Sequence, residues 1–123
     1  MNSVIIMGRL TANPELRTTE SGVNVTTFTV AVDRDYVKAG EDRQTDFLRV
    51  IAWRSTAEFV TRYFTKGKMI AVEGSLQTRK YTDKSGAEKE ATEIIADKVH
   101  FCGDKKEEKK EEKKEEDALP WED

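Results

Sequence analysis

The nine residues TDFLRVIAW, numbered 45–53, decide how the fold is interpreted, because their side chains alternate between two kinds. Leu48, Val50 and Ala52 form an ordinary apolar face, which predicts a β-strand with one side on a core. Large aromatic rings and a cation rarely share the solvent side of a strand. The opposite face therefore either packs on another strand or subunit or binds a ligand; it holds Phe47, Arg49, Ile51 and Trp53.

Segments of similar character lie on both sides of this strand. Alternating or continuous apolar runs predict strands, and turn signals such as Asn13-Pro14, Glu20-Ser21-Gly22 and the stretch 82–86 separate them. The predicted strands are VIIMGRL (4–10), NVTTFTVAV (24–32), MIAVEGSLQTRKY (69–81) and ATEIIADKVHF (91–101).

The apolar period changes to that of a helix between the third and fourth strands. Ser55 and Glu58 fit a capping box at its start, and Gly67 suits its end. One apolar stripe runs along it, made of Phe59, Val60, Tyr63 and Phe64. Three strands, a helix and a two-strand hairpin predict an all-β protein with one helix, arranged as a five-stranded OB-fold barrel.

The chain of 123 residues divides by charge into a body and a tail. Residues 1–103 hold 15 basic and 14 acidic side chains, a charge of +1, whereas residues 104–123 hold 6 and 10, a charge of −4. KKEE occurs three times in the tail, so like charges stand four residues apart and disfavour a helix. We expect a folded domain over 1–103 and a disordered linker with a C-terminal tip over 104–123.

Two further clusters combine an aromatic ring with cations beside a predicted loop. Tyr36 stands among basic residues before the polar loop 38–43, and Tyr81 follows Arg79 and Lys80. Each alone is typical of a solvated strand end. Together with the strand first quoted they favour a surface for single-stranded nucleic acid, because bases stack on rings while cations follow the backbone.

The sequence gives little support for an enzyme, a cofactor or a metal site. His100 is the only histidine and Cys102 the only cysteine, and both fall at the end of one predicted strand. No metal-binding or phosphate-binding motif occurs. No run of 18 apolar residues or signal-peptide pattern is present, and the single thiol fits a reducing compartment, so we expect a cytoplasmic or nuclear protein.

TDFLRVIAW, GSLQTRKYTDKSG and the acidic end with LPW resemble bacterial-type single-stranded DNA-binding proteins. The resemblance runs from about Asn2 to Phe101, and VIIMGRLTANPELR looks like the first strand and turn of that family. It implies a homotetramer of OB folds that coats single-stranded DNA without sequence preference during replication, recombination and repair. It also implies a location at the bacterial nucleoid, or in the host cytoplasm for a phage-encoded copy.

The resemblance assigns roles to particular side chains. The positions that match the family's base-stacking rings are Tyr36, Phe47, Trp53 and Tyr81. The family's basic positions match Arg49, Lys66, Arg79 and Lys80, to which we add Arg9 as a phosphate-binding candidate.

The C-terminal tip resembles the family's partner-docking segment, which ends in Pro-Phe and binds replication, recombination and repair proteins. The matching residues are Asp117, Leu119, Pro120, Trp121, Glu122 and Asp123. Trp121 replaces the usual phenylalanine, and two acidic residues follow it.

Two other functions stay open on the residues alone. An OB module could serve as a protein-binding scaffold of a replisome or primosome, with the aromatic face as a subunit interface. The same surface could bind single-stranded RNA, because rings and cations do not by themselves distinguish the 2′-hydroxyl.

Overall fold

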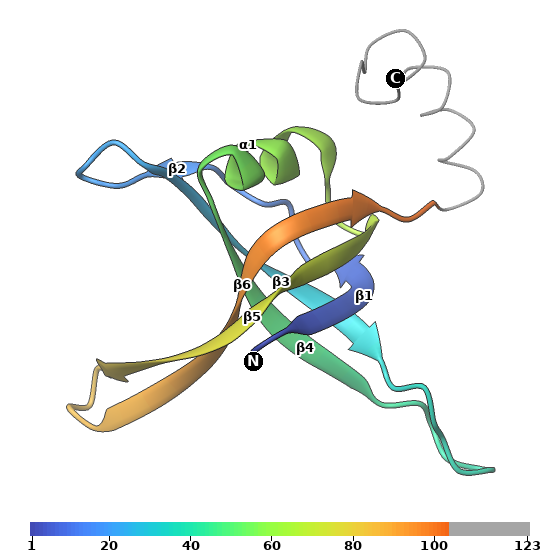
Figure 1. The fold of residues 1–123 in the computed structure, drawn as a ribbon. Helices are drawn as coiled ribbons and strands as arrows, with labels where there is room; N and C mark the ends of the chain where they lie inside the picture. Colours follow the sequence, from blue (N-terminus) through green and yellow to red (C-terminus); the bar gives the residue numbers. More distant parts are fainter. Residues whose placement is uncertain (104–123) are drawn as a thin grey trace, which may run out of the picture.

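The computed structural model describes residues 1–103, which form six strands and one helix (Figure 1). The all-β class with a single helix is confirmed over this range, and the tail lies outside the described residues. No helix among residues 1–103 is long and apolar enough to cross a membrane. The elements are β1 (Val4–Leu10), β2 (Arg17–Thr18), β3 (Asn24–Asp33), β4 (Thr45–Trp53), α1 (Arg54–Tyr63), β5 (Met69–Thr82) and β6 (Glu88–Phe101).

Five of the strands close into a barrel. They pair in the order β1-β5-β6-β4-β3, and β3 pairs again with β1 through Arg9 with Ala31 and Leu10 with Val30. The other pairings are antiparallel except for a short parallel contact between β4 and β6. This closed five-stranded sheet with its helix between the third and fourth main strands confirms the predicted OB-fold. β2, which was not predicted, pairs its two residues with Asn24 and Val25 at the start of β3.

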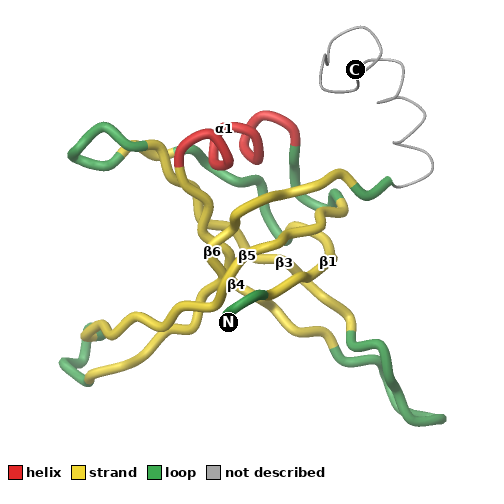
Figure 2. The backbone as a smooth tube through the Cα atoms, in the orientation of Figure 1, coloured by secondary structure: helices red, strands yellow, loops and turns green. Residues whose placement is uncertain are grey.

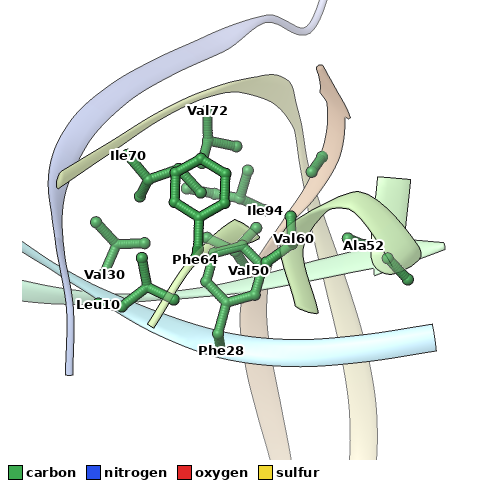
Figure 3. Packing of buried hydrophobic residues seen from close by; sticks show 12 residues of the cluster. Leu10, Phe28, Val30, Val50, Ala52, Val60, Phe64, Ile70, Val72 and Ile94 are labelled. Carbon is green, nitrogen blue, oxygen red and sulfur yellow. The ribbon is translucent and has the colours of Figure 1, made fainter. Parts of the chain in front are cut away.

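The barrel interior is filled with side chains (Figure 3). Val30, Val50 and Val72 come from three different strands and are fully buried, as their inward alternation requires. The helix α1 contributes Val60, and Phe64 directly after it is also buried. A closed, filled barrel of this size leaves the outer surface as the place for a ligand.

Two hairpins extend from the barrel on the side away from α1, as Figures 1 and 2 show. One is the outer half of β5 and β6, which stay paired as far as Thr82 and Glu88 although burial along β5 stops at Ser75. The other is the β3–β4 hairpin, which continues past the strands as the loop 34–44. We call them the β5–β6 arm and the β3–β4 arm.

The prediction of a capping box at the helix was wrong. The helix starts directly after β4, with Trp53 at the N-cap and no capping side chain, while the carboxylate of Glu58 accepts a hydrogen bond from Asn24 Nδ2 at 2.9 Å. Arg54 turns the chain with φ at 58°, so Ser55 is already helical and cannot cap. The predicted stop at Gly67 was also wrong, because the C-cap is Phe64 in an extended conformation.

Two glycines permit the close strand contacts of the barrel. A Cβ on Gly8 would lie 2.2 Å from the carbonyl oxygen of Ala31, where β1 crosses to β3. A Cβ on Gly74 would lie 2.0 Å from the carbonyl oxygen of Ile95, next to an irregularity in the β5–β6 pairing. Both clashes are with backbone, which cannot rotate away as a side chain can.

We expect Gly74→Ala to lower the free energy of unfolding by about 1–3 kcal/mol, the usual effect of overpacking. Ser75→Ala, at the neighbouring half-buried position, is the control and should change it by less than about 0.5 kcal/mol. Urea unfolding followed by circular dichroism measures both. Equal stability of the two variants would contradict the close approach at Gly74.

Candidate nucleic-acid interface

The outer face of β4 carries large exposed side chains, as its alternation predicts. Phe47 is 67% exposed and Trp53 is 42% exposed, whereas Val50 and Ala52 between them are fully buried. The side chain of Arg49 is about half exposed. The predicted division of this strand into a core face and an aromatic, basic outer face is confirmed.

The barrel register extends this face onto neighbouring strands. Ala31 lies opposite Phe47 on one side and opposite Arg9 on the other, so the three side chains share one face. Two strand spacings separate Arg9 from Phe47, which is about 10 Å. Arg9 Nη1 also donates to the carbonyl of Gly67 at 2.9 Å, which brings it beside the chain at Lys66. Arg9 thus marks one edge of the face, and Lys66 directly precedes its hydrogen-bond acceptor Gly67 in the chain.

An ion-pair network links β4 to the β5–β6 arm. Arg49 Nε lies 3.1 Å from Glu93 Oε2, and Arg79 binds the same carboxylate through Nε at 3.3 Å and Nη2 at 3.2 Å. Glu93 is only 3% exposed. Its hydrogen bond and charge raise the pKa of Arg79, so that guanidinium stays charged. The two predicted cations are therefore held together.

The β5–β6 arm presents its predicted residues on two different faces. The guanidinium carbon of Arg79 lies 5.5 Å from the ring centre of Tyr81, and this ring is 40% exposed. Lys80 lies between them and, by strand alternation, points to the reverse face of the arm. The structure thus brings Arg79 and Tyr81 together and separates Lys80 from them.

Tyr36 lies in the loop of the β3–β4 arm, beyond the end of the paired strands. It is 76% exposed and lines an open hollow of the loop together with Lys38 and Arg43. The base of this loop is held by Arg34, whose Nε and Nη2 each donate to Asp46 at 3.1 Å. The bond to Arg34 lowers the pKa of Asp46.

Two further residues belong to this surface, although sequence reasoning missed them. Glu93 is one; its only signal was an acidic residue directly before two isoleucines in a predicted strand. Arg17 is the other: it lies on β2, and its Nη2 approaches Thr27 Oγ1 at 3.5 Å on the strand beside β4. A strand of two residues leaves no periodic signal, so Arg17 could not be placed from the pattern.

Exposed rings and cations, rather than clustered metal ligands, characterise the described part of this surface. Among residues 1–103, no three His, Cys, Asp or Glu side chains gather as metal ligands would. His100 pairs with Glu73 on the outside of the barrel, and burial raises the pKa of the Cys102 thiol, which makes it less reactive. What the face offers is exposed rings and fixed cations.

Comparison with known proteins identifies the family of the chain. The model of the single-strand binding protein family matches residues 1–102. The chain belongs to this family. It is 48% identical over 101 residues to single-stranded DNA-binding protein 1 of Staphylococcus aureus strain Mu50, and 46% identical over 101 residues to the single-stranded DNA-binding protein of Caldanaerobacter subterraneus.

These alignments include 82% of the chain in both cases. They span 65% of the length of the first relative and 67% of the second. The family match ends at residue 102, so it adds nothing on the charged tail.

The conformation of the turn at the tip of the β5–β6 arm should depend on pH through the carboxylate of Asp83. Its carboxylate accepts hydrogen bonds from Ser85 Oγ at 2.7 Å, Ala87 N at 3.0 Å and Ser85 N at 2.9 Å, which lower its pKa below 3.8. The lowered pKa means that these bonds stabilise the turn above pH 3.8 and are lost as the pH falls further. The amide signals of Ser85 and Ala87 should shift together in an NMR titration from pH 6 to pH 2.

Asp83→Asn is the control for this titration, because its side chain keeps an acceptor oxygen but does not ionise. The two amide signals should then stay constant over the same pH range. A wild-type tip that also showed no change below pH 4 would contradict the assigned role of Asp83.

Proposed function

We propose that this protein coats single-stranded DNA without sequence preference, as a non-enzymatic binding protein that needs no cofactor. The observation that carries the proposal is the outer face of β4, where exposed Phe47 and Trp53 flank Arg49. The two relatives described above are named single-stranded DNA-binding proteins, which supports the same conclusion.

The spacing of the rings suits successive bases rather than one pocket. Phe47 and Trp53 are six residues apart on a strand, which is about 20 Å. Each ring therefore stacks on a different base, and each stacked base contributes about 1–3 kcal/mol. Tyr81 and Tyr36 on the two arms extend the set of platforms in two directions. Stacking of this kind accepts any base, which explains the absence of sequence preference.

The cations supply the contacts to phosphate. Arg9 lies at one edge of the face with Lys66 next to its acceptor Gly67, and Arg49 and Arg79 are held together by Glu93. Arg17 adds a cation beside β3, the strand that carries Thr27. Lys80 contacts single-stranded DNA that passes behind the β5–β6 arm. Each phosphate neutralised on a single strand changes the slope of log K against log salt by about −0.7.

Self-association, as a homotetramer, is part of the proposal. Ile5 is 71% exposed and Met7 is 56% exposed on the outer face of β1. Among the described residues, β1 is paired with β5 along Val4–Arg9 but with β3 only at Arg9 and Leu10, so most of one edge is open. An open edge beside apolar side chains favours a second copy of the chain.

We expect Phe47→Ala and Trp53→Ala each to weaken binding of a long oligo-dT about tenfold or more, since each removes one stacked base. Leu16→Ala is the control: this exposed side chain lines a hollow with Glu58 and Arg62 of α1, and the variant should bind as the wild type does. Titration by fluorescence anisotropy, with mass measured by light scattering, gives affinity and oligomeric state together.

The two other functions predict different results in that titration. A protein-binding scaffold would change its mass in the two aromatic variants and would show no oligo-dT binding in the wild type. An RNA-binding protein would prefer poly-U to poly-dT in competition. Either result would overturn the proposal.

The tail is proposed to recruit replication, recombination and repair proteins through the tip 117–123. This recruitment would take place on DNA in the cytoplasm. Leu119, Pro120 and Trp121 are the only group there that combines apolar and aromatic side chains. The tail's charge of −4 repels phosphate, so it does not itself bind DNA.

Removal of residues 104–123 should therefore leave oligo-dT affinity unchanged or slightly higher. The same anisotropy titration, performed on the full chain and on the chain ending at Gly103, measures the difference. A marked loss of affinity in the shortened chain would show that the tail takes part in DNA binding.

A further inference from the structure

A buried carboxylate lies within the surface proposed to bind a polyanion. The Glu93 side chain is only 4% exposed, yet it contacts both Arg49 and Arg79, whose side chains are 53% and 51% exposed. An acidic group at this position opposes phosphate by its charge. Its retention there needs a physical reason, because an ion pair of this kind is weak evidence for stability.

The barrel topology explains how one carboxylate reaches both arginines. β6 lies between β4 and β5, which do not pair with each other. Val50 pairs with Ile94, so Arg49 and Glu93 are neighbours on the outer face. Gln77 pairs with Glu93, so Arg79 lies one step further along that face of β5. Glu93 is thus the bridge between cations from two separate strands.

The contacts leave most donors of the arginines available. A guanidinium has five N–H groups. Arg49 contacts Glu93 through Nε, and Arg79 uses Nε and one N–H of Nη2. The remaining N–H groups belong to half-exposed side chains and are available to phosphate oxygens. The carboxylate fixes the inner edges of both guanidinium groups.

We propose that Glu93 is a positioning residue that holds Arg49 and Arg79 as one two-part phosphate clamp. This inference rests on the proposed function and deepens it. Without Glu93, the two cations repel each other and each must lose side-chain freedom when it meets the strand. With Glu93, that ordering is present before DNA arrives, although the net charge of the three groups falls from +2 to +1.

Charge and positioning make opposite predictions for Glu93→Gln, which keeps the shape but removes the negative charge. If charge alone mattered, the variant would bind oligo-dT as tightly as the wild type or more tightly. If positioning matters, it binds about tenfold more weakly, because two rotamer-rich side chains must be ordered on binding. Glu88→Gln is the matched control: it removes the same charge from the same strand, near the arm tip opposite Thr82.

The test is an oligo-dT titration of five proteins: the wild type, Glu93→Gln, Glu88→Gln, Arg49→Ala/Arg79→Ala and the triple variant that adds Glu93→Gln. We expect loss for Glu93→Gln, no loss for Glu88→Gln and no further loss in the triple variant. The contrary result is that Glu93→Gln lowers the affinity of the double variant by the same factor as that of the wild type. That result would show that Glu93 acts through the fold alone and would overturn the inference. Affinity of Glu93→Gln equal to or above that of Glu88→Gln would overturn it too.

Failure of the two proposals is distinguishable in this design. A wild type that does not bind oligo-dT removes the proposed function, whereas a wild type that binds and a Glu93→Gln variant that binds equally well removes only the clamp. If Glu93→Gln does not fold, the Arg Nε–H signals of the wild type carry the test by NMR. They should keep their hydrogen-bonded shifts when oligo-dT is added, and loss of those shifts would contradict a clamp held by Glu93.

Discussion

The structure depends on closure of the barrel between β1 and β3. This pairing joins only Arg9 to Ala31 and Leu10 to Val30. It requires a residue without a Cβ at position 8, because a Cβ there would lie 2.2 Å from the carbonyl oxygen of Ala31. Once closed, the barrel has an interior just wide enough for side chains, so apolar groups fill it. A ligand can then be bound only outside, and the outer residues of each strand become the functional ones.

Closure also explains how a nearly neutral body can offer a basic surface. The charge of residues 1–103 is only +1, and basic and acidic residues are interleaved along the chain. The fold separates them in space by pairing some and exposing others. Asp46 is bound to Arg34 at the base of an arm, whereas Arg9 is brought to the face that carries the exposed rings, and Arg49 and Arg79 share the single carboxylate of Glu93. Net charge along a sequence is therefore a poor guide to the charge of one face.

The sequence predicted those features that depend on local alternation. The bounds of the strands at 4–10 and 45–53 agree with the structure, and so does the division of residues 47–53 between core and surface. Alternation alone also implies that Lys80 faces away from Arg79, although both were expected to bind phosphate.

Features that depend on distant contacts or on an unusual backbone could not be predicted. Ser55 and Glu58 satisfy a capping box locally, but the N-cap is Trp53, so the helix starts two residues too early for it, at the left-handed turn of Arg54. Glu93 acquires its meaning from Arg79, 14 residues before it, and from Arg49 on a strand that pairs in parallel. The role of this acidic residue on a face with exposed cations is thus visible only in the folded chain. In the proposed clamp it converts two cations with general attraction for phosphate into donors of fixed direction, while the proposed stacking on the rings adds affinity that does not depend on charge.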